Sequence, residues 1–253
     1  MRRVLRKVAR EVRRPFRPRP PRPQRLGDEP QWIRDIVERV IPFTLTSHER
    51  IAALCNAVEY IVRSDIPGDI VECGVWRGGS MMAAALSLLH LGDTDRNLYL
   101  FDTFTGMTAP TSLDRRISDG TPAADLLEAS RREGNNWGVP AQDVRRNIVS
   151  TSYPVSRICL VEGRVEDTVP ASAPKEIALL RLDTDWYEST HHELIHLYPR
   201  VTPAGVLIID DYGFFTGARK AVDEYIAGER LPILLHNIDG EGRIAVKISR
   251  RDG

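Results

Sequence analysis

Acidic residues follow two apolar segments of this 253-residue chain, and they are its strongest chemical signal. Asp183 and Asp185 come directly after the apolar 177–182 segment, and Asp210 and Asp211 come directly after 206–209. Short apolar runs are typical of buried parallel strands, whose carboxyl ends meet at the ligand crevice of an open α/β sheet. Because carboxylates gathered there repel one another, we expect a divalent cation or protons to neutralise them. The alternative is that one or two of them cap the helices that follow.

A glycine-containing segment, Glu72–Ser80, joins the first expected strand to its helix. Glycines let the backbone turn tightly and approach a ligand, which the N–H groups of the helix start then face. The segment is neither Gly-x-Gly-x-x-Gly, because Trp76 takes the middle position, nor a phosphate loop, because Gly-Lys-Ser/Thr is missing. With the acidic Glu72, this composition favours an amino-acid-bearing nucleoside over a dinucleotide. A tight turn without a ligand is the alternative.

Two further strand ends contribute candidate cofactor contacts. Asp102 ends the second strand, 28 residues after Gly74, and an acid at that place commonly accepts hydrogen bonds from ribose hydroxyls. A helix cap or a turn-forming role is the alternative for Asp102. Gly163 follows the third strand, where it would lie near an adenine ring. We therefore add Gly163, and Thr103 beside Asp102, to the expected cofactor-binding residues.

Strands and helices alternate along the chain, which predicts a doubly wound, mostly parallel α/β sheet. The apolar patterns predict strands at 69–73, 97–101, 157–161, 177–182 and 206–209, a closing hairpin at 232–237 and 243–249, and helices at 31–41, 47–63, 80–91, 122–132, 142–149, 188–198 and 218–227. The connection 103–156 is too long and polar for a plain link. We expect a lid over the substrate at about 105–150.

Composition and charge divide the chain into a body and an arm. Hydrophobic residues make up 42% of the chain, enough for one substantial core in a domain at 29–253. Residues 1–25 hold ten arginines and one lysine against a single glutamate, with prolines that prevent a regular helix over 17–23. We therefore interpret 1–28 as a mostly disordered basic arm, for which a solvated tail is favoured over contact with nucleic acid or anionic lipid.

The sequence also bears on the compartment in which the protein works. It shows no secretory signal and no stretch long enough to span a membrane. Its three cysteines are far apart and lie in apolar surroundings, so we expect free thiols in a reducing cytoplasm.

Four motifs, in this order along the chain, resemble those of the macrocin O-methyltransferase family. They are Glu72–Gly79, Phe101–Phe104, Leu182–Thr190 and Ile208–Tyr212, within a resemblance that runs from about residue 41 to 226. Members are metal-dependent enzymes that use S-adenosylmethionine to methylate sugar hydroxyls of antibiotics. The resemblance implies the seven-stranded, Rossmann-like class I methyltransferase fold, with N-terminal helices and an antiparallel last strand.

The resemblance also implies roles for individual residues. Glu72, Gly74 and Ser80 would line the methionine side of S-adenosylmethionine, and Asp102 would hold the ribose. Asp183, Asp210 and Asp211 would bind Mg²⁺, an ion that prefers oxygen ligands. Asp183 is the first choice for the base that takes the proton of the acceptor hydroxyl, and Asp185 is the second.

We therefore expect a Mg²⁺-dependent O-methyltransferase that acts on a small-molecule glycoside, with a homo-oligomer left open. One alternative is a nucleotide-binding oxidoreductase of the same architecture, although the spacing of the glycines counts against it. The other is a non-enzymatic module that binds nucleic acid or a membrane through the basic arm.

Overall fold

Five short apolar segments form the parallel centre of a seven-stranded sheet. The computed structural model describes residues 29–248, so the predicted arm 1–28 lies outside the described residues. The strands follow the order β3-β2-β1-β4-β5-β7-β6, and β7 runs antiparallel to both of its neighbours. The strands are β1 (Asp69–Cys73), β2 (Leu98–Asp102), β3 (Ile158–Glu162), β4 (Ile177–Leu182), β5 (Val201–Ile209), β6 (His236–Asn237) and β7 (Arg243–Val246). The predicted mostly parallel α/β sheet is confirmed.

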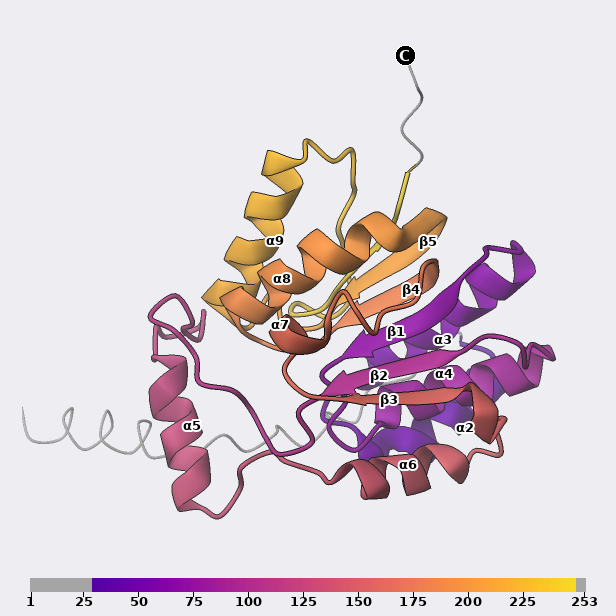
Figure 1. Ribbon diagram of the computed structural model, residues 1–253, viewed down its shortest axis with the longest axis horizontal. Coiled ribbons are helices and arrows are strands. Elements are labelled where there is room, and N and C mark those ends of the chain that lie inside the picture. Colours follow the sequence, from indigo (N-terminus) through magenta and orange to yellow (C-terminus); the bar gives the residue numbers. More distant parts are fainter. Residues whose placement is uncertain (1–28, 249–253) are drawn as a thin grey trace, which may run out of the picture.

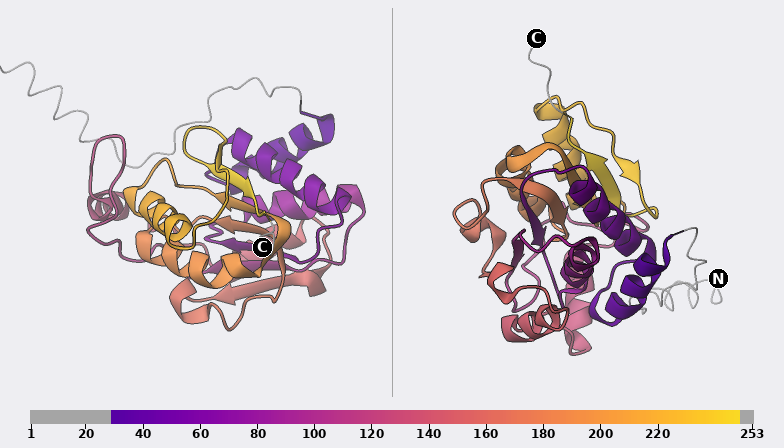
Figure 2. Two further views of the ribbon diagram at one scale, coloured as in Figure 1. Left: turned by 90° about the horizontal axis from the view of Figure 1, so that it is seen from above. Right: turned by 90° about the vertical axis from the view of Figure 1, so that its right-hand side faces the viewer.

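Helices cover both faces of the sheet, as Figures 1 and 2 show. One face carries α2 (Gln31–Val40), α3 (His48–Arg63), α4 (Gly79–Leu91) and α6 (Ala141–Val149), and the other carries α7 (Val165–Thr168), α8 (Tyr187–Leu197) and α9 (Thr216–Gly228). Because helices lie on both sides, every residue of β4 is buried. This burial is why the central strands read as continuous apolar runs rather than as alternating ones.

Local sequence sets the ends of the helices that support the site. The Ser47 hydroxyl accepts a hydrogen bond from the backbone N–H of Arg50 at 3.2 Å, which caps α3 at its start. The helix α4 is apolar nearly all round because it lies between the sheet and the helices α2 and α3. It ends at Gly92, whose φ of 76° is a left-handed conformation that glycine adopts readily.

The long connection between β2 and β3 divides into two parts. Its second helix, α6, is part of the body, because Val144 and Ile148 are fully buried in the core below α4. Its first helix, α5 (Ala123–Arg132), stands apart from the sheet in Figure 1 and packs instead on Trp186 and Phe215. We call residues 105–138 the insertion; they are the part of the expected lid that lies outside the main core.

The insertion is attached to the loops that follow β4 and β5. The backbone N–H of Ile117 donates to the carbonyl of Phe214, after β5, at 2.8 Å, and the indole N–H of Trp186, after β4, donates to the Thr108 carbonyl at 3.2 Å. These bonds place the insertion beside the ends of the two strands that carry the acidic residues. Within residues 29–248, no helix combines the length and apolar character needed to cross a membrane.

Candidate active site

The segment between β1 and α4 turns tightly at the carboxyl edge of the sheet. Gly74 has a φ of 80°, and a Cβ there would overlap the backbone carbonyl of Asp183. Gly78, with a φ of 85°, is the N-cap of α4. The closeness of Gly74 to Asp183 means that the segment predicted to bind the cofactor touches the loop that carries the acidic residues.

Asp102 shapes the loops on both sides of it. One carboxylate oxygen accepts hydrogen bonds from the backbone N–H groups of Val75, at 2.7 Å, and Trp76, at 3.3 Å. The other accepts from the backbone N–H of Phe104 at 2.7 Å. A carboxylate has about four acceptor positions, so Asp102 keeps capacity for a ribose hydroxyl while it orders the turn.

The other expected cofactor residues lie around this turn. The Thr103 hydroxyl donates to the Gly106 carbonyl at 2.6 Å, and the backbone N–H of Gly163 donates to the Asp102 carbonyl at 3.0 Å. Glu72 and Ser80, in contrast, are buried beneath the turn, with exposed fractions of 1% and 3%. The structure therefore brings Asp102, Thr103 and Gly163 together at the carboxyl edge of the sheet, and it buries Glu72 beneath the turn between β1 and α4.

Three carboxylates converge where β4 and β5 end. Asp183, Asp185 and Asp211 each have a carboxylate oxygen within 4.8 Å of those of the other two. Asp185 adopts a left-handed backbone conformation with a φ of 67°, which aspartate tolerates better than most residues. The buried Oδ2 atom of Asp211 has no hydrogen-bond partner in the described structure.

The electrostatics of this cluster favour an added positive charge. Burial, followed by repulsion from neighbouring carboxylates such as Asp183, raises the pKa of Asp185 to about 7. The same two causes raise the pKa values of Asp183 and Asp211 well above the usual range, although Arg181 opposes the shift at Asp183. An all-oxygen set with an unpartnered oxygen suits a hard divalent cation such as Mg²⁺.

Asp210, which we expected among the metal ligands, bonds with two arginines instead. Its oxygens lie 2.5 Å from Arg181 Nη2 and 2.5 Å from Arg50 Nη1, and the Thr46 hydroxyl donates to it at 3.1 Å. Burial opposes ionisation of Asp210, but the two guanidinium groups outweigh it and lower the pKa. The prediction that Asp210 binds a metal stays untested, and Asp185 takes its place in the observed cluster.

Arg50 and Arg181 are functional candidates that our sequence analysis did not identify. Arg181 is the one charged residue in the apolar β4 segment, and a charge inside a buried strand normally has a partner. That signal could have shown that Arg181 pairs with the acids. For Arg50 the sequence offers no comparable signal, because arginine in an amphipathic helix is ordinary.

The aromatic residues after Asp185 differ in role. Trp186 is only 3% exposed and meets the Phe215 ring edge-on, with ring centroids 5.0 Å apart, in an apolar cluster that includes α5. Tyr187 is partly exposed, and its hydroxyl donates to Glu224 at 2.8 Å. Trp186 is therefore a packing residue, whereas Tyr187 reaches the surface.

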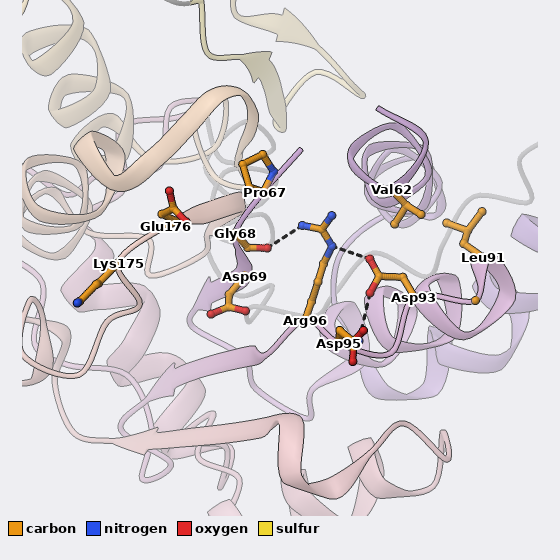
Figure 3. A pocket seen from close by; sticks show the side chains of 11 residues that line it. Val62, Pro67, Gly68, Asp69, Leu91, Asp93, Asp95, Arg96, Lys175 and Glu176 are labelled. Carbon is orange, nitrogen blue, oxygen red and sulfur yellow. Dashed lines mark hydrogen bonds and ion pairs between the residues drawn. The ribbon is translucent and has the colours of Figure 1, made fainter. Parts of the chain in front are cut away.

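A separate surface hollow lies at the opposite edge of the sheet, shown in Figure 3. Residues at the amino ends of the strands line it, including Asp69 of β1 and Glu176 just before β4. Arg96 is held there by Asp93 at 2.7 Å and by the Gly68 carbonyl at 2.7 Å. Ligands of open α/β sheets bind at the carboxyl ends of the strands, so this hollow is not the active site.

Comparison with known proteins identifies the family. The model of the macrocin-O-methyltransferase (TylF) family matches residues 30–246. An 8-demethyl-8-(2,3-dimethoxy-alpha-L-rhamnosyl)-tetracenomycin-C 4'-O-methyltransferase from Streptomyces olivaceus is 32% identical over 202 residues, 80% of this chain and 74% of the relative. A demethyldecarbamoylnovobiocin O-methyltransferase from Streptomyces niveus is also 32% identical, over 79% of this chain and 73% of the relative.

A solved structure agrees with these relatives. The O-methyltransferase NovP superposes with a TM-score of 0.71 at 31% identity, over 82% of this chain and 83% of NovP. The match excludes both alternatives from the sequence, the oxidoreductase and the non-enzymatic module. The chain belongs to the macrocin-O-methyltransferase family and is an S-adenosylmethionine-dependent O-methyltransferase.

Proposed function

We propose that this enzyme methylates a sugar hydroxyl of a glycosylated natural product, with Mg²⁺ bound at the cluster of Asp183, Asp185 and Asp211. The observation that carries the proposal is that this cluster lies in contact with the turn at Gly74. The names of relatives support a glycoside acceptor: one acts on a rhamnosyl tetracenomycin, and another on mycinamicin III.

The cofactor would bind along the turn from Gly74 to Gly78. Asp102 would accept a hydrogen bond from a ribose hydroxyl at its remaining acceptor position, while Thr103 and Gly163 would face the adenosine part. Glu72 and Ser80 would support the methionine side from below, because both side chains are buried. These residues would orient the methyl donor toward the carboxylates, and such alignment is the main requirement for an in-line displacement.

The carboxylates have two tasks in the proposal. The clustered residues would hold Mg²⁺, which, when bound, lowers the pKa of the acceptor hydroxyl. Asp183 is the first choice to receive the hydroxyl proton, and its side chain, 27% exposed, is open to a substrate. Asp185 is the second. Asp210 would join the metal ligands only by giving up a bond to Arg50 or Arg181.

Transfer of a labelled methyl group tests this proposal. Enzyme treated with EDTA and then dialysed is incubated with methyl-labelled S-adenosylmethionine and a panel of rhamnosides and related glycosides, with and without Mg²⁺. We expect label on a sugar hydroxyl only when Mg²⁺ is added. Full activity of metal-free enzyme would refute the role of the cation, and label only on an aglycone hydroxyl would refute the sugar acceptor.

We further propose that the enzyme works in the cytoplasm. All three cysteines are free, and Cys55 and Cys73 are buried, as expected for a reducing compartment. Cell fractionation checks the location. Light scattering after size-exclusion chromatography decides whether the chain forms the homo-oligomer that the sequence left open.

A further inference from the structure

Arg181 joins three strands through one side chain. Its Nη1 atom lies 2.6 Å from Oε1 of Glu72, on β1, and 2.6 Å from Oδ2 of Asp183, after β4. Its Nη2 atom lies 2.5 Å from Oδ1 of Asp210, after β5. The side chain of Arg181 is only 4% exposed, so water screens these contacts little.

The backbone joins the same two loops at the same place. The backbone N–H of Asp183 donates to the Cys73 carbonyl at 2.8 Å, and Gly74 packs against the Asp183 carbonyl. Glu72 directly precedes Cys73. The Arg181 guanidinium and the backbone therefore both connect the start of the turn from Gly74 to Gly78 with the carboxylate cluster. A displacement of Asp183 would therefore shift Arg181 and, through it, Glu72.

Around Arg181 there are more carboxylates than positively charged groups. Arg181 shares one charge among three carboxylates, and Oε2 of Glu72 is buried without a hydrogen-bond partner. Of the three carboxylates bound to Arg181, Arg50 bonds to Asp210 alone, and its other ion pairs are with Asp239, at 2.8 Å, and Glu241, at 2.6 Å. A divalent cation at Asp183 would reduce the demand on Arg181 and leave its guanidinium to Glu72.

We propose that Arg181 is a positioning residue that couples cation binding at the carboxylate cluster to cofactor binding at the turn after Glu72. The inference rests on the proposed function, because it takes the cluster as the cation site. With the cation bound, Arg181 holds Glu72 more firmly, and the turn is ordered before the cofactor arrives. Preordering of a binding segment tightens binding, so the coupling is positive.

Binding measurements test the coupling without any acceptor. S-adenosylhomocysteine affinity is measured by calorimetry in EDTA and in saturating Mn²⁺, and Mn²⁺ affinity is measured by electron paramagnetic resonance with and without S-adenosylhomocysteine. In the wild type we expect each ligand to tighten the other about fivefold or more, by the same factor in both experiments. In Arg181→Met the factor should fall to less than about twofold.

Three more variants make the test decisive. Arg96→Met removes another ion-paired arginine, at the opposite edge of the sheet, and should keep the wild-type factor. Glu72→Gln cuts the link at its other end and should lose the coupling while Mn²⁺ still binds. Arg181→Lys keeps the charge but not the planar fork, so it replaces Arg181→Met if that variant fails to fold, and it should show reduced coupling.

The outcomes separate this inference from the proposed function. If both ligands bind the wild type independently, or if the Arg181 and Glu72 variants keep the full factor, the coupling role of Arg181 is refuted while the methyltransferase proposal stands. If Mn²⁺ does not bind the wild type at all, the cation site fails, and the inference fails with it.

Discussion

The acidic residues after β4 and β5 lie close enough to repel one another, and this repulsion determines their chemistry. Asp183, Asp185 and Asp211 lie together, whereas Asp210, next in the chain to Asp211, has both oxygens engaged by arginines. The same residue type therefore serves two purposes within a few ångströms. Carboxylates with raised pKa values are suited to hold a cation or accept a proton, and the paired Asp210 is suited to anchor the loops.

Removing one negative charge from the cluster should separate chemistry from binding. We expect Asp183→Asn and Asp185→Asn to lower kcat by about 10²- to 10⁴-fold, the range for loss of a general base, with little change in S-adenosylhomocysteine affinity measured in EDTA. Asp65→Asn is the matched control, because Asp65 is exposed and shares the left-handed conformation of Asp185, with a φ of 50°. Steady-state kinetics and calorimetry check this, and equal losses in the control would contradict it.

Gly74 should be intolerant of a side chain for a reason separate from its backbone angle. Gly74→Ala adds both left-handed strain and overlap with the Asp183 carbonyl, whereas Gly92→Ala adds only the strain, because nothing lies within 4 Å of its Cβ. We expect Gly92→Ala to cost about 1–2 kcal/mol of unfolding free energy. Gly74→Ala should cost more and also weaken cofactor binding.

Chemical denaturation and calorimetry on the two glycine variants measure these effects. Equal stabilities and unchanged cofactor affinity in both would show that the Gly74–Asp183 contact is unimportant.

At the scale of elements, the insertion is fixed beside the site by a buried aspartate. Oδ1 of Asp114 accepts from the backbone N–H of Tyr187, the first residue of α8, at 2.8 Å. Its Oδ2 accepts from the backbone N–H and hydroxyl of Thr111, at 2.6 and 2.9 Å. Asp114 is fully buried, and Gly217 leaves the space that its carboxylate fills.

Loss of this carboxylate should loosen the insertion before the body. Asp114→Ala leaves buried N–H groups without an acceptor, at a cost of about 1–3 kcal/mol. We expect faster proteolysis within 105–138, with protection restored in part by S-adenosylhomocysteine and Mg²⁺. Asp119→Ala, which removes an exposed partner of Arg116 in the same insertion, is the control and should be cut at the wild-type rate. Cleavage sites read by mass spectrometry decide between them.

The sequence predicted most elements closely, and it failed where tertiary contacts decide. The strands at 69–73 and 177–182 match β1 and β4, because their apolar runs have clear ends. The strand β5 begins at Val201, earlier than the predicted start at 206, because Pro203 and Gly205 interrupt the apolar pattern of its first part. The short helix α7 was missed because four residues give no apolar period.

For the site, sequence reasoning located the right strand ends but not the charge pairing. Four acids at two strand ends were enough to predict a carboxylate cluster. Their division into the cluster of three and an Asp210 held by two arginines depends on Arg50, 160 residues away from Asp210 in the chain. A single sequence holds no local trace of such a pair.

At the scale of the whole molecule, the buried carboxylates should make stability depend on pH and on the cation. Burial raises the pKa values of Asp185 and Glu72 to about 7, so the folded state binds more protons than the unfolded state between about pH 4 and 7. Stability from these groups is thus full below about pH 4 and is lost as the pH rises through 7.

Mg²⁺ should therefore raise Tm more at pH 7.5 than at pH 5.5, by at least about 3 °C in the difference. Differential scanning fluorimetry in EDTA and in Mg²⁺ measures this. Asp185→Asn should reduce the difference, whereas Asp65→Asn should not. A Mg²⁺ effect that is equal at both pH values would contradict the assignment of these carboxylates to the cation.

Arg50 also links the site to the last hairpin of the chain, which has a consequence for how the enzyme is made. Its partners Asp239 and Glu241 are 189 and 191 residues further along. During synthesis the cofactor turn and the strand ends leave the ribosome well before these two acids do. Contacts between distant parts of a chain form slowly, so a nascent chain holds Arg50 without two of its three acidic partners until the hairpin of β6 and β7 has been synthesised.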